Sequence, residues 1–230
     1  MLQTIRETSK LAVLRTKALV SFGRLVRDPN RLDEVFAIAD ALSEADQGPM
    51  REMVAALSKR EDGARAFRER PRIGTIDLAT LLALPDGTLG HAFAEHMNAN
   101  GLVPEALPSL EAHNDLDYLR AHLYETHDVW HVVAGFGTDV AGELGLQAFY
   151  LAQTSGPLPR TLLTLGLLNS ALYAREDFDR RVSEIARGFA IGSQARPFFG
   201  VRWADRWSTP LEDVRRELGV ESSSVTLAAA

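Results

Sequence analysis

Residues 115–153 read DLDYLRAHLYETHDVWHVVAGFGTDVAGELGLQAFYLAQ, and this segment carries the clearest structural pattern of the chain. Its apolar residues recur at helical spacing, which predicts one helix over residues 115–133 and a second that ends near Gln153. Gly135-Phe136-Gly137 interrupts the pattern, and Thr138 is a residue type that caps the start of a helix. Two helices joined by so short a loop pack against each other in antiparallel fashion. We therefore expect a helical hairpin here.

Outward from this hairpin, the rest of the chain is also helical by pattern. Turns rich in Pro and Gly separate the apolar segments, and no alternating pattern typical of a strand is found. Further helices are expected over residues 2–26, 31–42, 50–57, 78–84, 89–98, 160–174, 177–189 and 210–218. The sequence predicts an all-α fold, a single bundle-like domain over residues 1–220, with a disordered tail at 221–230.

Composition narrows the classes of function. The chain has 230 residues, of which 46% are hydrophobic and 24% charged, so it can bury a core without disulfides or metals. It has no cysteine, which excludes thiol nucleophiles, cysteine zinc sites and iron–sulfur clusters. A net charge of −6 argues against a general nucleic-acid binder.

The N-terminal segment is basic although the whole chain is acidic. Residues 1–31 carry seven Lys or Arg and two acidic residues, interleaved with apolar residues at helical spacing. The pattern over residues 1–27 is typical of an amphipathic helix on an anionic membrane surface. An ordinary surface helix with a basic outer face accounts for it equally simply. No run of 18 apolar residues is found. The richness in arginine is compatible with a cleaved targeting peptide, but Glu7 lies early and no apolar region with a small-residue cleavage site follows.

All six histidines lie between His91 and His131, and two of them share a short motif. His127 and His131 are four residues apart, so on a helix they project from one face. Asp128 follows the first histidine, and Glu143 lies early in the second helix of the hairpin, where it can face the pair. These imidazoles and carboxylates predict a metal site for zinc, iron or another divalent ion.

The same residues are compatible with roles that need no metal. The two histidines could be a packing pair, and Glu125 and Asp139 are rival carboxylates or simply solvated charges. A zinc protease is disfavoured because its motif places a glutamate inside the histidine pair as the general base. A phosphohydrolase of the His-Asp type needs a separate upstream histidine. His96 could supply it, but His131 and Glu143 do not fit that class.

The run His-Asp-x-x-His, eleven residues and then Glu resembles the signature of the ubiquinone (coenzyme Q) biosynthesis protein family, the fourth of the Coq proteins. The resemblance extends over about residues 20–220. Within the family, the chain resembles a bacterial branch. Segments elsewhere that resemble family landmarks are 28–31, 70–73, 84–90, Tyr118, 142–143, Trp203 and 210–215.

The resemblance implies a metal, usually described as zinc, on His127, Asp128, His131 and Glu143. It also implies peripheral membrane attachment and association with other quinone-biosynthesis proteins. Two roles follow from it. One is an enzyme that replaces a ring carboxyl with hydroxyl by oxidative decarboxylation, through the metal. The other is a non-catalytic lipid-binding scaffold with a structural metal.

A bound precursor would carry a polyprenyl tail, which needs an apolar groove because each buried CH₂ contributes about 0.8 kcal/mol. The leucine-rich segment 162–172 offers such a surface, or it is simply a core helix. The residues that we expect to bind the substrate or lipid are Leu163, Leu167, Arg175, Tyr124 and Gln147. Arg180 and Arg181 could hold an anionic head group, or be solvated charges. Trp203 and Trp207 could lie at a membrane interface, but packing is favoured.

The sequence departs from the mitochondrial-type pattern before and after the motif. Residues 122–125 read His-Leu-Tyr-Glu, and Gln147 and Tyr150 stand where Lys and Glu often occur. The ligand could therefore be a different prenylated molecule. The expected partners are a prenylated quinone precursor or other isoprenoid lipid, a membrane surface, and a second copy in a homodimer. The expected location is the cytoplasmic side of a bacterial membrane, or the mitochondrial inner membrane in a eukaryote.

Overall fold

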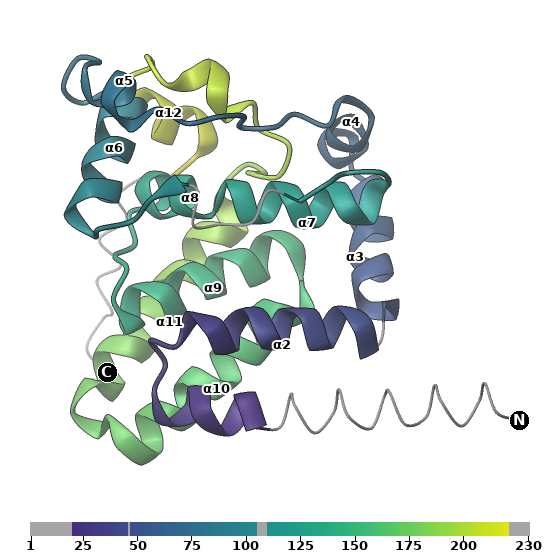
Figure 1. The fold of residues 1–230 in the computed structure, drawn as a ribbon, viewed down its shortest axis with the longest axis vertical. Coiled ribbons are helices and arrows are strands. Elements are labelled where there is room, and N and C mark those ends of the chain that lie inside the picture. Colours follow the sequence, from purple (N-terminus) through teal and green to yellow (C-terminus); the bar gives the residue numbers. More distant parts are fainter. Residues whose placement is uncertain (1–19, 46, 105–109, 221–230) are drawn as a thin grey trace, which may run out of the picture.

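A computed structural model describes residues 20–45, 47–104 and 110–220 (Figure 1). These residues form helices and turns without a strand, which confirms the expected all-α class. A helix over residues 20–27 is followed by α2 (Leu32–Ala45), α3 (Gly48–Ser58), α4 (Glu61–Glu69), α5 (Leu78–Leu82), α6 (Leu89–Ala99), α7 (Asp115–Glu125), α8 (His127–Ala134), α9 (Val140–Thr154), α10 (Pro157–Tyr173), α11 (Phe178–Gln194) and α12 (Leu211–Leu218), with short 3₁₀ turns at Arg175–Asp177 and Trp203–Arg206.

Helix α9 lies at the centre, with α11 along one side and α10 along another (Figure 1). The α9–α11 contact is close because glycines face each other across it. A Cβ atom on Gly188 would overlap the backbone carbonyl of Gly145. Side chains at these two positions would force the helices apart, so the glycines set the position of α9.

The largest buried cluster packs α6, α8, α9, α11 and the C-terminal segment together. Trp130 of α8 is fully buried and meets Phe149 and Phe198 edge to face. Trp203 is buried against Phe198, and Trp207 lies against Phe93. Both C-terminal tryptophans therefore pack within this part of the molecule, as favoured from the sequence. Helix α8, which carries the histidine pair, is held in the core by these aromatic contacts.

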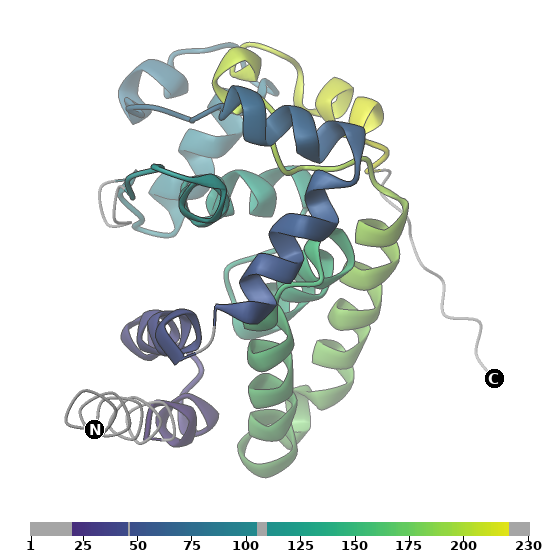
Figure 2. The same ribbon diagram turned by 90° about the vertical axis from the view of Figure 1, so that its right-hand side faces the viewer.

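The helix over residues 20–27 and α2 lie together against α10 (Figure 2). Leu25, Ile38 and Leu165 form a small apolar cluster at this contact. The side-chain amide of Asn169 donates to the carbonyl of Val26 at 2.7 Å, which ties the two parts of the chain together.

Arg181, considered a head-group ligand from the sequence, instead has its side chain inside the fold. It donates to Asp177 at 2.7 Å and to Asn169 at 2.6 Å, and it is 6% exposed. Arg180 is exposed and pairs with Asp177 and Asp139. Contacts within the protein therefore account for the positions of both arginine side chains.

The prediction of one continuous helix over residues 115–133 is wrong, because the structure has two helices, α7 and α8, separated at Thr126. The hydroxyl of Thr126 donates to the carbonyl of His122 at 2.8 Å, a contact that often bends helices. The expected cap at Thr138 is also wrong. Asp139 caps α9 by accepting from the amide of Gly142, whereas Thr138 donates to Asn100.

Helix α4 was not expected from the sequence. It has a strong acidic and basic surface, and its buried face consists of Gly63, Ala66 and Phe67 alone. The predictions for residues 1–19 and for the tail at 221–230 lie outside the described residues. Within the described ranges, no helix has both the length and the apolar character needed to cross a bilayer.

Candidate metal centre

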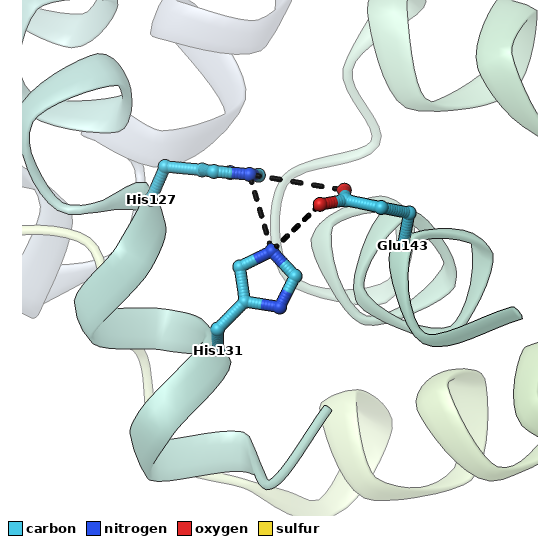
Figure 3. A group of neighbouring side chains, drawn as sticks. All are labelled: His127, His131 and Glu143. Carbon is cyan, nitrogen blue, oxygen red and sulfur yellow. Dashed lines mark hydrogen bonds and ion pairs between the residues drawn. The ribbon is translucent and has the colours of Figure 1, made fainter. Parts of the chain in front are cut away.

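Helix α8 presents His127 and His131 one turn apart, and α9 presents Glu143 opposite them (Figure 3). The Nε2 atoms of the two histidines are 3.3 Å apart. The Glu143 carboxylate lies 3.1 Å from Nε2 of His131 and 3.8 Å from Nε2 of His127. One ligand atom from each residue lies within 4.8 Å of the others, so the three could share one metal ion.

The loop after α8 fixes this arrangement. Gly135 ends the helix with a left-handed conformation (φ 71°), which glycine adopts without strain. Arg215 donates to the carbonyls of Val132 and Val133, and Arg187 donates to the carbonyl of Gly135. These contacts satisfy carbonyl groups at the end of α8, where cations are also favoured by the helix dipole.

His131 is oriented by a hydrogen bond on its other ring nitrogen. Its Nδ1 donates to the carbonyl of Phe136 at 3.2 Å, which leaves a lone pair on Nε2 directed at Glu143 and His127. Two imidazole nitrogens and a carboxylate that converge so closely repel one another unless a proton or cation lies between them. The donor set therefore fits a divalent metal held by nitrogen and oxygen.

The protonation states of Glu143 and His127 favour metal binding, whereas that of His131 favours a proton that a metal would have to displace. Burial raises the pKa of Glu143, but the hydrogen bond and charge of His131 and the charge of His127 outweigh it, so its pKa lies below the usual range. Burial lowers the pKa of His127, which favours the neutral ring that a metal needs. Burial lowers the pKa of His131, but the hydrogen bond and charge of Glu143 outweigh it and the pKa is raised, so metal binding at Nε2 would release a proton.

The centre opens on a cavity of about 550 Å³ with mainly apolar walls. Its walls come from the helix over residues 20–27 and from α2, α3, α7, α8, α9 and α10. Apolar side chains from six of these elements are Leu25, Val35, Met53, Leu123, Leu144 and Leu162. A cavity of this size, apolar with polar groups at one wall, is typical of a small-molecule site.

The structure brings part of the predicted site together. Tyr124 and Gln147 line the cavity, as does Asp128, which is adjacent to the histidine pair but not one of the three mutually close ligands. The apolar wall from α10 is formed by Pro157, Leu158 and Pro159 in the first turn, followed at helical spacing by Leu162 and Gly166.

The other expected lipid contacts lie elsewhere. Leu163 packs against Leu144 and Ala148, Leu167 is 36% exposed, and Arg175 is bonded to the carbonyl of Ala171 at the end of α10. None of these three side chains lines the cavity.

The rival carboxylates have other partners. Glu125 forms a two-pronged ion pair with Arg72, and Asp139 caps α9 and pairs with Arg180. His96 stacks on His131 with ring centroids 5.7 Å apart, and its Nε2 is buried without a hydrogen-bond partner in the part of the chain that the structure describes.

The N-terminal wall of the cavity was not foreseen from the sequence. Leu25, Pro29 and Val35 belong to segments that read only as a basic amphipathic helix, a turn and a second helix. Only their three-dimensional packing on α10 brings them to the cavity, so no local pattern could have indicated it.

Comparisons with known proteins agree with this architecture. A model of the family "Coenzyme Q (ubiquinone) biosynthesis protein Coq4" matches residues 4–224. A mitochondrial ubiquinone biosynthesis protein COQ4 homolog of Danio rerio is 27% identical over 93% of this chain and 79% of its own length. The mitochondrial coq4 protein of Botryotinia fuckeliana is 32% identical over 72% of this chain and 60% of its own length.

A crystal structure also resembles this fold. It is that of a candidate ubiquinone biosynthesis protein from Nostoc punctiforme, 34% identical, with a TM-score of 0.79 over 90% of this chain and 99% of the other. The eukaryotic relatives are named as mitochondrial. From the family match, the relatives and the shared fold, we conclude that the chain belongs to the Coq4 family, whose members function in coenzyme Q biosynthesis.

Proposed function

We propose that the protein binds a polyprenylated aromatic intermediate of quinone biosynthesis in the cavity, with its ring beside a divalent metal on His127, His131 and Glu143. The observation that carries this proposal is the opening of the ligand cluster on the apolar cavity. A head group and a lipid tail have opposite solvation needs, and the cavity offers a polar wall and apolar walls in one space.

The catalytic form of the proposal is oxidative decarboxylation of the ring. Replacing a carboxyl by hydroxyl releases CO₂ and removes two electrons from the ring, so it requires an oxidant such as dioxygen. A bound metal would supply Lewis acidity and, if it is iron, a means of handling dioxygen. The three close ligands leave room for a further ligand, which supports catalysis over a closed structural site.

The protein's own groups would act on the ring by position and charge. Glu143 stays ionised, and His131 keeps the tautomer that its bond to Phe136 selects. Gln147 and Tyr124 lie in the cavity wall, where they can orient polar groups of the ring. The apolar walls exclude water, which strengthens each of these polar contacts.

The alternative is a non-catalytic scaffold that presents the lipid to other quinone-biosynthesis enzymes. In that role Asp128 would join the other three residues and close a structural site, since it follows His127 on α8 and lines the same cavity. Both forms of the proposal place the protein at a membrane surface, where its lipid would be delivered, and include a homodimer.

The test is anaerobic purification of the full chain, followed by metal analysis and mass spectrometry of extracted lipids. The proposal expects bound zinc or iron and a prenylated aromatic compound, with the metal lost in His127→Ala. A prenylated hydroxybenzoate labelled with ¹³C in its carboxyl group separates the two forms. Release of ¹³CO₂ in the presence of dioxygen and a reductant supports the enzyme, and its absence with lipid and metal bound supports the scaffold. Unchanged metal content in His127→Ala would refute the site.

A further inference from the structure

The two histidines of the metal centre differ in how their rings are held. His131 has a hydrogen bond on Nδ1, from which its orientation follows. The Nδ1 atom of His127 has no hydrogen-bond partner among the described residues. Metal-ligating histidines usually donate this second nitrogen to a carboxylate, carbonyl or water, which fixes the ring. The His127 side chain is 29% exposed, so the contacts that its ring makes within the protein bear directly on its orientation.

One such contact is an aromatic stack. The ring of Tyr150 lies parallel to His127, with centroids 5.9 Å apart and planes inclined by 18°. Tyr150 also stacks on Trp130, with centroids 4.2 Å apart and planes inclined by 11°. Both separations fall near or within the range of favourable ring pairs.

The stack is anchored in the buried core. Trp130 is fully buried and packs edge to face on Phe149 and Phe198. Tyr150 is 5% exposed and belongs to the same core cluster. Its ring can therefore rotate little, and the flat surface that it offers limits the orientations open to His127.

The hydroxyl of Tyr150 is not what holds the ring in place. It is buried without a hydrogen-bond partner among the described residues, so its removal breaks no hydrogen bond to them. The aromatic ring and the hydroxyl can thus be separated by mutation. Tyr150→Phe keeps the stack, whereas Tyr150→Leu and Tyr150→Met remove it.

We propose that Tyr150 is a positioning residue for the metal ligand His127, which it orients by ring stacking. The inference rests on the metal site of the proposed function. It extends that function by assigning a role to a residue outside the ligand set.

The test is a Co²⁺ titration of the full chain, because the visible bands of bound Co²⁺ report ligand geometry. Tyr150→Phe is expected to keep the wild-type affinity and spectrum. Tyr150→Leu and Tyr150→Met are expected to shift the bands and weaken binding by about 10- to 100-fold, the usual effect of losing an outer-shell contact.

The fold supplies a matched control. Tyr118 is also fully buried and lies beside a histidine, His122, at 5.6 Å, but that histidine is not in the ligand cluster. Tyr118→Leu should lower stability as Tyr150→Leu does, yet leave the Co²⁺ spectrum unchanged. Circular dichroism confirms that each variant is folded.

The outcomes separate the two proposals. A wild-type spectrum and affinity in folded Tyr150→Leu or Tyr150→Met would overturn the role of the stack. Equal losses in Tyr150→Phe and Tyr150→Leu would also overturn it, because the hydroxyl rather than the ring would then matter. Failure of wild-type protein to bind Co²⁺, or unchanged binding in His127→Ala, would instead refute the metal site itself.

Discussion

The Nε2 atoms of His127 and His131 lie 3.3 Å apart, with the Glu143 carboxylate within 3.8 Å of both. Bound metal would link α8 to α9, because the histidines and the glutamate come from different helices. A ligand that binds only the folded state raises stability, by about 2.7 kcal/mol when its concentration is 100 times its dissociation constant.

We therefore expect added Zn²⁺ to raise the melting temperature of the full chain, and a chelator to reverse the change. His131→Ala should abolish the response. His113→Ala, which removes an exposed histidine outside the cluster, should retain it. Thermal unfolding followed by circular dichroism measures the effect, and an equal response in both variants would contradict the assignment.

A larger side chain on the α10 wall can reduce the volume of the cavity while the metal ligands stay unchanged. Leu162 lines the cavity, whereas Leu168, on another face of the same helix, is 45% exposed. Leu162→Trp should reduce the amount of co-purified lipid while the metal content stays at the wild-type level. Leu168→Trp adds the same side chain outside the cavity and should change neither. Equal lipid in both variants, measured by mass spectrometry, would show that the cavity is not the lipid site.

Asn169 holds the N-terminal wall through its bond to the carbonyl of Val26, and it also accepts from Arg181. Asn169→Ala removes both contacts and leaves a buried guanidinium with one fewer acceptor, at a cost of about 1–3 kcal/mol. Amide hydrogens in residues 20–27 should then exchange faster. Thr164→Ala, on an exposed face of α10, serves as the control. Unchanged exchange in Asn169→Ala would mean that the apolar cluster alone holds this wall.

His122 makes stability depend on pH. Burial lowers the pKa of His122 to about 4, because its ring lies inside the fold, where Nε2 accepts from the amide of Gly200 and Nδ1 donates to the carbonyl of Pro71. Below pH 6.5 the unfolded chain binds a proton at this histidine, whereas the folded protein does not until about pH 4. The contribution of His122 to the free energy of unfolding is therefore fully present above pH 6.5, and about 3 kcal/mol of it is lost as the pH drops towards 4.

His122→Gln can keep both hydrogen bonds but does not titrate. Its free energy of unfolding should fall less than that of the wild type between pH 6.5 and 4. Chemical denaturation at these two pH values measures the difference. His96 and His127, whose pKa values are also lowered by burial, are present in both proteins and cancel in the comparison. Parallel losses in the two proteins would contradict this role of His122.

The all-α class and the convergence of three metal-ligand candidates could be predicted from the sequence. The reason is that helical spacing is a local property, and four-residue spacing places His127 and His131 on one face. The predicted starts of the helices over residues 78–84 and 89–98 are confirmed, because their caps are local: the side chains of Asp77 and Thr88 accept from the helix amides that follow.

The predictions from the sequence fail where a tertiary contact determines the structure. Thr138 is a good cap by type, but its hydroxyl is taken by Asn100, 38 residues away, and Asp139 takes its place. For the same reason, Leu163 and Leu167, which the sequence analysis expects to contact the lipid, do not line the cavity. The helical period is visible in the sequence, but the face of α10 that meets the cavity depends on how α9 and the N-terminal helices pack around it.

Anomalous diffraction from crystals of the full chain grown with Zn²⁺ would locate the metal. The site described above predicts a peak at the zinc edge about 2.0–2.2 Å from Nε2 of His127, Nε2 of His131 and a carboxylate oxygen of Glu143. The same map would show whether Asp128 or a water completes the coordination. A map without a peak between these three residues, at full zinc loading of the protein, would contradict the metal centre.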